Sequence, residues 1–199
     1  DELKVQATEK FDELKKKVLA CRGCKLRDGC QQVVFGEGHP GLMVIGEGPG
    51  AEEDRLGRPF VGTAGQLLDK ILAAGGFDRK VNAYITNIVK CRPPSNRIPS
   101  ADESAACLPY LREQIQILQP QIILLLGATA LRYALNCSEG ITKVRGKWRE
   151  HEGALYMPTF HPAALLRDPR RKIDVWVDIQ EVVKKYRELV DPEHFSPYC

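Results

Sequence analysis

The chain has 199 residues, 43% of them hydrophobic and 28% charged, which is the composition of an ordinary globular protein and predicts one domain over residues 1–199. The longest apolar run, residues 122–126, is far too short to cross a bilayer, and the amphipathic N-terminus has no apolar signal region, so we expect no membrane role and a cytoplasmic location. A net charge of +3 only weakly indicates a polyanionic partner.

The first predicted element is an amphipathic helix over residues 7–20. Its apolar residues Phe11, Leu14 and Val18 recur at helical spacing. The helix leads directly into a Cys-x-x-Cys segment, Cys21 to Cys24, so a centre built on those cysteines is expected to fix the end of the helix.

A short apolar strand over residues 42–45 runs into Gly46-Glu47-Gly48-Pro49-Gly50, which is too rich in glycine to continue as strand or helix and predicts a tight loop. A helix follows over about residues 64–74. Residues 83–86 predict a second strand, which ends at Asn87.

Ser100 and Glu103 form a capping-box pattern that predicts the start of the next helix, in which Pro109 is an interior residue that favours a kink. A fully apolar strand over residues 122–126 and another helix come next. A fourth strand is expected over residues 155–159, and a long helix over about residues 172–189.

Strands that alternate with helices predict a three-layer α/β/α fold around a central, mainly parallel sheet of four strands. In such sheets ligands bind beyond the carboxyl ends of the strands. The unusual motifs of this chain all follow strands: the loop from Gly46, Asn87, residues 127–129 and Phe160-His161-Pro162. We therefore expect them to meet at one edge of the sheet.

Four of the seven cysteines form two separated pairs, Cys21/Cys24 and Cys91/Cys107. Four thiolates from distant segments suit a tetrahedral zinc ion or an iron–sulfur cluster. The spacing is irregular, unlike the ~15–20 residues between the two hooks of a zinc ribbon, which favours a cluster. Buried free thiols are the alternative. Cys30 is a rival ligand, whereas Cys137 and Cys199 have no partner pattern.

These segments together resemble the family 4, iron–sulfur type of uracil-DNA glycosylase found in bacteria and archaea. The resemblance spans nearly the whole chain and is specific because the motifs occur in one order: Cys21-x-x-Cys24, Gly46 to Gly50, Gly57-Arg58-Pro59-Phe60-Val61-Gly62, Asn87 to Pro94, Cys107 and His161 to Arg167. It implies a [4Fe-4S] cluster on Cys21, Cys24, Cys91 and Cys107, and an enzyme that removes uracil from DNA.

Uracil inside a duplex is out of reach, so the resemblance implies that the nucleotide is flipped into a pocket. The Asn87 amide can donate to uracil O4 and accept from N3–H, which cytosine does not allow. Phe60 would stack on the ring, and the backbone of Glu47, Gly48 and Pro49 would line the pocket. His161 is the expected donor to uracil O2, where charge develops as the glycosidic bond breaks.

Better-known relatives carry a water-activating Asp in the first loop, and Gly48 stands at that place here. Glu47 is the nearest carboxylate and is a hypothesis for the group that positions water. Leu165 is a candidate wedge into the base stack, or alternatively helix core. The DNA phosphates are assigned to five arginines: Arg92, Arg97, Arg167, Arg170 and Arg171. Basic residues also recur over residues 143–149. This strip fits phosphate contact and an ordinary solvated face equally well.

Two other interpretations stay open from the sequence. One is a non-catalytic nucleic-acid-binding protein with a structural zinc, and the other is a relative that bonds covalently to uracil-containing DNA. The covalent branch carries an additional basic loop with a reactive histidine, and nothing like it lies between Cys91 and Cys107. Hydrolytic release by a monomer that acts on uracil-containing DNA is therefore the favoured hypothesis.

Overall fold

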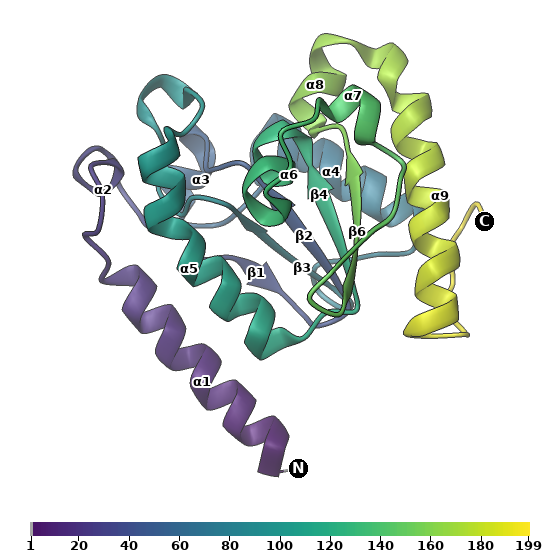
Figure 1. Cartoon of the computed structure of the whole chain (residues 1–199), viewed down its shortest axis with the longest axis horizontal. Coiled ribbons are helices and arrows are strands. Elements are labelled where there is room, and N and C mark those ends of the chain that lie inside the picture. The colour runs from purple at the N-terminus through teal and green to yellow at the C-terminus, as the bar shows by residue number, and fades with distance from the viewer. Residues whose placement is uncertain (1) are drawn as a thin grey trace.

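The structure is a computed structural model that describes residues 2–199, and a sheet of six strands runs through its middle (Figure 1). The strand order is β1-β3-β2-β4-β6-β5. The strands are β1 (Glu37–Gly38), β2 (Leu42–Gly46), β3 (Ala83–Asn87), β4 (Ile122–Leu126), β5 (Arg149–His151) and β6 (Ala154–Thr159).

The four predicted strands, β2, β3, β4 and β6, pair in parallel and form the centre of this sheet. The expected α/β class is confirmed, but the predicted size is wrong because the sheet is larger and mixed. β1 joins one edge antiparallel to β3, and β5 joins the other edge antiparallel to β6. Both edge strands are short and are not buried, so neither leaves an apolar pattern in the sequence.

Helices cover the sheet on both faces, in the layers that the alternating sequence predicts (Figure 1). They are α1 (Glu2–Leu19), α2 (Leu26–Gly29), α3 (Ala51–Leu56), α4 (Thr63–Ala74), α5 (Ala101–Leu118), α6 (Gly127–Leu135), α7 (Ile141–Val144), α8 (Pro162–Arg167) and α9 (Lys172–Leu189), with 3-10 turns at Pro94–Asn96 and Pro169–Arg171.

The apolar core is divided by the sheet, because successive side chains of a strand point to opposite faces. Leu42 and Val44 of β2 pack with α4 and α9, whereas Met43 and Ile45 pack with α5 and α6. All five residues of β2 are buried, as expected for a central strand of a covered parallel sheet.

The predicted start of the helix after Ser100 is confirmed, because the capping box forms there. Ser100 accepts from the Glu103 main-chain N–H and Glu103 accepts from the Ser100 N–H, and α5 begins there and continues through Pro109 to Leu118. No helix within residues 2–199 is long and apolar enough to span a membrane. The parallel strands end at Gly46, Asn87, Leu126 and Thr159, so the segments that follow them converge at one edge of the sheet.

Candidate functional site

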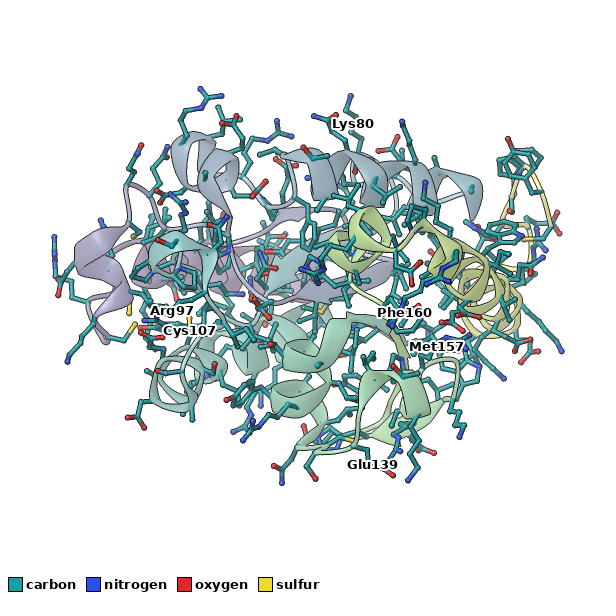
Figure 2. All side chains as sticks on the ribbon, turned by 90° about the horizontal axis from the view of Figure 1, so that it is seen from above. Lys80, Arg97, Cys107, Glu139, Met157 and Phe160 are labelled. Atoms are coloured by element: carbon teal, nitrogen blue, oxygen red, sulfur yellow. The ribbon has the colours of Figure 1, made fainter. Side chains whose placement is uncertain are left out.

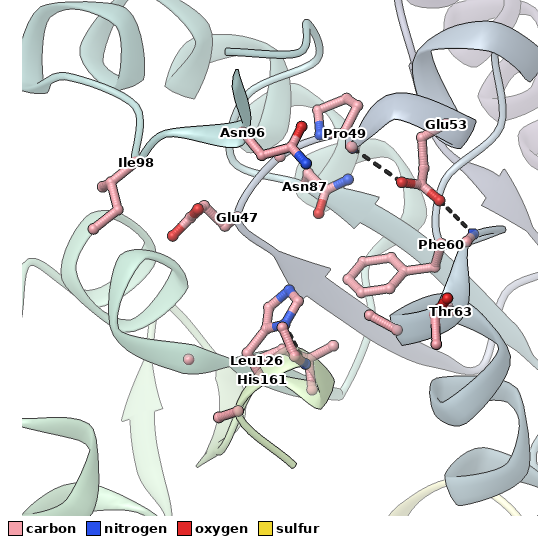
Figure 3. A pocket seen from close by; sticks show the side chains of 18 of the residues that line it. Glu47, Pro49, Glu53, Phe60, Thr63, Asn87, Asn96, Ile98, Leu126 and His161 are labelled. Atoms are coloured by element: carbon pink, nitrogen blue, oxygen red, sulfur yellow. Dashed lines mark hydrogen bonds between the residues drawn. The ribbon is translucent and has the colours of Figure 1, made fainter. Parts of the chain in front are cut away.

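A pocket of ≈ 840 Å³ lies at the carboxyl edge of the sheet, and the segments that the sequence singled out line it (Figure 3). This volume is in the range of sites that hold a small molecule or a nucleoside. The predicted residues among its lining are Glu47, Gly48, Pro49, Phe60, Asn87, Arg97, His161, Arg167 and Arg171.

Asn87 ends β3 at the floor of this pocket and is 1% exposed. Its Oδ1 atom has no hydrogen-bond partner among residues 2–199, although nearly all buried polar atoms are paired. The side chain lies close over Gly46, where an added Cβ would come within 2.6 Å of Asn87 Oδ1 and 2.5 Å of Phe60 Cζ. Glycine at position 46 therefore lets the amide and the ring share one small space.

Phe60 forms one wall of the pocket, and hydrogen bonds to the main chain around it fix its position. Its φ of 50° is a left-handed conformation, which costs energy in any residue with a side chain. The buried Arg79 donates to the carbonyls of Pro59 (2.7 Å) and Phe60 (2.8 Å) and forms ion pairs with Asp69 and Glu37. These bonds fix the strained turn that presents the ring.

His161 lies beside Phe60, with 5.5 Å between the two ring centroids and 32° between the ring planes. Its Nδ1 accepts from the main-chain N–H of Ala163 at 3.1 Å, so in the neutral ring the proton is on Nε2. That nitrogen faces the space between Asn87 and Phe60 (Figure 3). Burial and, to a smaller extent, the positive charge of Arg167 lower the pKa of His161 to about 4, against the opposing effect of Glu53. The imidazole is thus a neutral donor.

Glu47 follows β2 and is partly exposed to the pocket. Its Oε2 accepts a hydrogen bond from the Thr129 hydroxyl of α6 at 2.6 Å, which holds the carboxylate at the rim. At the next position, a Cβ added to Gly48 would come within 2.7 Å of Val89 Cγ2, so a carboxylate side chain there requires its neighbours to move. Glu47 is therefore the acidic residue that this structure offers in place of a carboxylate at position 48.

Glu53 of α3 ties two loops of the site together. One carboxylate oxygen accepts from the Gly50 N–H at 3.0 Å, and the other accepts from Val61 at 2.8 Å and Gly62 at 2.6 Å. Because carboxylates that accept several main-chain N–H groups fix backbone geometry, Glu53 holds the glycine-rich loop against the turn that carries Phe60 (Figure 3).

The predicted wedge residue Leu165 is buried. It lies in α8, is 1% exposed and belongs to the apolar cluster around α4 and α9. This burial favours the alternative that the sequence left open, helix core, and the wedge role stays a prediction. Helical periodicity turns Leu165 inward and leaves its neighbour Leu166 at 46% exposure.

The five predicted arginines divide into two groups. Arg167 and Arg171 line the pocket, and the guanidinium of Arg171 lies 4.6 Å from the centroid of the Phe160 ring. Arg97 also lines it, but both of its terminal nitrogens bond to Glu103 at 2.7 and 2.8 Å. Arg92 bonds to Asn96, and Arg170 is paired with Asp168; neither residue is among the pocket lining.

The basic strip over residues 143–149 is largely neutralised by neighbouring carboxylates. Lys143 and Arg149 both pair with Glu139, at 3.1 and 2.8 Å. Arg145 is held by the buried carboxylate of Asp178, which also accepts from Thr159. These contacts favour the alternative interpretation of the strip as ordinary surface and structural charge.

The four predicted cysteine ligands line one second, nearly apolar pocket between α1, α2, the β3 end and α5. As the side chains stand, no three His, Cys, Asp or Glu residues within residues 2–199 form a ready metal-binding group. The donor set nevertheless fits an iron–sulfur cluster, because four thiols from three segments share one cavity of low polarity. Cys107 and Phe160, which mark the two pockets, lie well apart in Figure 2.

Burial raises the pKa of both Cys91 and Cys107. Neighbouring thiols act in the same direction, whereas the positive charge of Lys90 lowers the pKa of Cys107. The rival ligand Cys30 lies beside Cys91 and accepts from Arg27 at 3.5 Å, but the residues that line the pocket do not include it. The arrangement favours the four-cysteine set without Cys30.

Sequence reasoning missed four residues that support the site: Glu53, Arg79, Lys90 and Thr129. Glu53 had a signal, because it stands three positions after Gly50 at the start of a helix, which is capping-box spacing. Arg79 acts on Phe60, which is distant in sequence, so no local pattern marks it. Thr129 lies in the 127–129 motif, but its contact with Glu47 forms only in the folded chain. Lys90 lies in the motif from Asn87 to Pro94, but its burial results from tertiary packing, which the motif does not reveal.

Comparison with known proteins gives consistent matches over this architecture. The sequence model of the Uracil DNA glycosylase superfamily matches residues 33–183. The type-4 uracil-DNA glycosylase of Sulfurisphaera tokodaii is 42% identical, over 94% of this chain and 89% of its own. The type-4 uracil-DNA glycosylase of Thermotoga maritima is 41% identical, over 93% of this chain and 97% of its own. A type-5 uracil-DNA glycosylase of Pyrobaculum aerophilum is 32% identical over 66% of this chain.

Proposed function

Because the chain belongs to the type-4 family within the Uracil DNA glycosylase superfamily, and so is a DNA repair enzyme that excises uracil, we propose the residue roles by which it does so. The pocket at the carboxyl edge of the sheet takes the flipped nucleotide. Asn87, Phe60 and His161 surround the base, and Glu47 lies at the rim beside them.

The observation that carries this proposal is the unpartnered Oδ1 of Asn87. A buried acceptor without a partner costs about 1–3 kcal/mol, which a bound ligand recovers when it supplies a donor. Uracil supplies that donor at N3–H and offers O4 as an acceptor for the Asn87 NH₂ group. With the amide in this orientation, cytosine would face it with a lone pair at N3 and a donor at N4, so both contacts would be repulsive.

His161 is the proposed electrophile. Cleavage of the N-glycosidic bond leaves negative charge on the base, and a neutral Nε2–H donor that faces the pocket stabilises that charge at uracil O2. Phe60 stacks on the ring and limits its tilt, so that O2 stays in line with the donor. Both side chains are fixed before the substrate arrives, which is the condition for electrostatic preorganisation.

Glu47 is the proposed water-positioning group. Water must attack the sugar as an oxocarbenium-like centre forms, and a carboxylate at the rim can orient that water or stabilise the positive sugar. The hydrogen bond from Thr129 fixes one carboxylate oxygen and leaves the other to act.

Cys21, Cys24, Cys91 and Cys107 are the proposed ligands of a [4Fe-4S] cluster. Base excision transfers no electrons, so the cluster's role is to hold together the end of α1 and the segment from Cys91 to Cys107, whose Arg92 and Arg97 would then face the DNA. Cys107→Ser is expected to lose iron and absorption near 400 nm, whereas the exposed Cys199→Ser keeps both. A Cys107→Ser protein with full iron content would contradict this ligand set.

We further propose that residues 1–199 form one catalytic domain that acts as a monomer on uracil-containing DNA. Arg167 and Arg171 line the pocket, which supports a role in holding the phosphates that flank the flipped nucleotide, although Arg171 also pairs with Asp168 at 3.6 Å. Light scattering after gel filtration, with and without a uracil duplex, measures the number of chains in the complex.

The activity is tested with matched duplexes that carry one uracil or one thymine at the same position. An abasic site is expected only in the uracil duplex, detected as strand cleavage after alkali treatment. Equal cleavage of both duplexes, or of neither, would contradict the proposed recognition.

A further inference from the structure

Lys90 is a fully buried charge that the proposed mechanism does not use. The side chain is 1% exposed and lies just beyond β3, three residues after Asn87 and directly before Cys91. A buried lysine is retained only when its hydrogen bonds are satisfied, so its three partners identify what it does.

The Lys90 Nζ atom lies within hydrogen-bond distance of three oxygens, at 2.5 Å from Thr86 Oγ1, 2.8 Å from the Asn87 carbonyl and 2.7 Å from Gln114 Oε1. Each oxygen must accept. The Thr86 hydroxyl donates its own proton to the Phe35 carbonyl, and the Gln114 NH₂ group donates to Phe35 and to the Tyr84 hydroxyl. All three acceptors are satisfied when the nitrogen carries three protons, as in the ammonium form, although burial lowers the pKa of Lys90 to about 7.

This ammonium group therefore fixes the end of β3 at two successive residues, Thr86 and Asn87. The Asn87 side chain emerges from the same residue whose carbonyl Lys90 binds, so the bond sets the peptide plane from which the amide points into the pocket. Gln114 anchors the Lys90 side chain to α5.

Lys90 also lines the cavity of the four cysteines. A positive group is complementary in sign to a set of thiolates. One side chain thus contacts the strand end that reads the base and borders the cysteine pocket, which are otherwise separate sites.

We propose that Lys90 is a positioning residue for uracil recognition, which holds Asn87 in register through its main-chain carbonyl and links that register to the cysteine pocket. The inference rests on the proposed role of Asn87. Because a displacement of about 1 Å can cost ~10²-fold in rate, loss of the Lys90 contacts is expected to slow excision substantially without removing any group that touches the base.

The test compares Lys90→Met, which keeps the length of the side chain but not its donors, with Lys80→Met, the same change at an exposed lysine before β3. Iron content and thermal unfolding are measured first. Binding is then measured to a duplex with 2′-fluoro-2′-deoxyuridine, which resists cleavage, and to the same duplex with an abasic-site analogue. Lys90→Met is expected to weaken uracil binding about 10-fold or more and to leave abasic-site binding unchanged, whereas Lys80→Met changes neither.

A double-mutant cycle separates positioning from general damage. If Lys90 acts through Asn87, the single-turnover rate of Asn87→Ala/Lys90→Met equals that of Asn87→Ala alone. Additive losses, equal weakening on both duplexes, or uracil binding at the level of the unmodified protein would each overturn the proposal.

If Lys90→Met does not fold or does not retain iron, Gln114→Met carries the test, because it removes one acceptor and keeps the charge. The same selective loss of uracil binding is expected there, and its absence overturns the proposal. The proposed function fails separately: the unmodified protein would then release no uracil from an ordinary uracil duplex, whatever Lys90 does.

Discussion

The Nδ1 atom of His161 accepts the main-chain N–H of Ala163 at 3.1 Å, and this one contact decides the chemistry that the imidazole can perform. It places the ring proton on Nε2, on the side that faces Asn87 and Phe60. Because α8 begins at Pro162, the N–H that His161 accepts is one of the free donors of the first helical turn. The helix start therefore sets the tautomer.

Replacement of His161 by alanine, whose side chain has no hydrogen-bond donor, tests this arrangement. Loss of one preorganised donor is expected to lower the single-turnover rate by about 10²–10³-fold, while affinity for an uncleavable uracil duplex changes little. The measurement is a quenched time course with enzyme in excess. A rate within a few-fold of the unmodified protein would remove His161 from the mechanism.

The lowered pKa of His161 also predicts a pH dependence. Because that pKa lies at about 4, the ring stays neutral at all pH values well above it, so no inflection near pH 6.5 is expected in the single-turnover rate. Below pH 6.5 the unfolded chain binds a proton that the folded ring refuses, so this group's contribution to stability is complete above pH 6.5 and is lost as the pH falls toward 4. Rates and urea midpoints measured from pH 4 to 8 check both statements.

Glu47→Gln tests the water-positioning role. The amide keeps an oxygen for the Thr129 hydroxyl but loses the charge that orients water or stabilises the sugar, so the chemical step is expected to slow by at least 10²-fold. Thr129→Val is the matched control: it leaves the carboxylate in place and removes only its tether, with a smaller loss. Cleavage at the normal rate by Glu47→Gln would dismiss the role.

Glu53→Gln is expected to destabilise the protein, because an NH₂ group would replace an oxygen that main-chain N–H groups need as an acceptor. The free energy of unfolding should fall by about 1–3 kcal/mol, and uracil affinity should fall with it since the Phe60 turn loosens. Glu52→Gln changes the same chemistry one residue earlier on an exposed side chain, and should stay within about 0.5 kcal/mol. Equal effects of the two changes in urea denaturation would contradict the assignment.

The sequence was sufficient for the central parallel strands because each is apolar and short and is followed by a glycine, asparagine or histidine motif. The sequence did not reveal β1 and β5, which are two and three residues long. These strands form by pairing with β3 and β6 at the edges of the central sheet, which a local pattern does not show. The convergence of Asn87, Phe60 and His161 on one pocket was predictable from the resemblance of their motifs.

The supporting contacts were not predictable in the same way. Arg79 reaches Phe60 across 19 positions and Thr129 reaches Glu47 across 82, so the pairs form only once the sheet has assembled. The motif that contains Leu165 gives its position in the chain but not whether a short helix turns the side chain toward the core, where the structure has it. Burial of a single side chain is a property of the packed fold.

Arg167→Ala tests the phosphate contacts. Arg167 lines the pocket, is exposed, and has no ion pair with any carboxylate in residues 2–199, so its charge is available to DNA. Its loss is expected to reduce the slope of log K against log salt by about one. Lys80→Ala, before β3 at the opposite end of that strand, should leave the slope unchanged. The measurement is fluorescence anisotropy of a uracil duplex at several salt concentrations.

The position of a bound base tests the central claim most directly. In a crystal of the protein soaked with uracil, the ring is expected on the Phe60 face, with the Asn87 amide and His161 Nε2 each within about 2.7–3.2 Å of its polar edge. Density for uracil outside this pocket, or a ring that contacts Phe60 but leaves the Asn87 Oδ1 unpaired, would contradict the account.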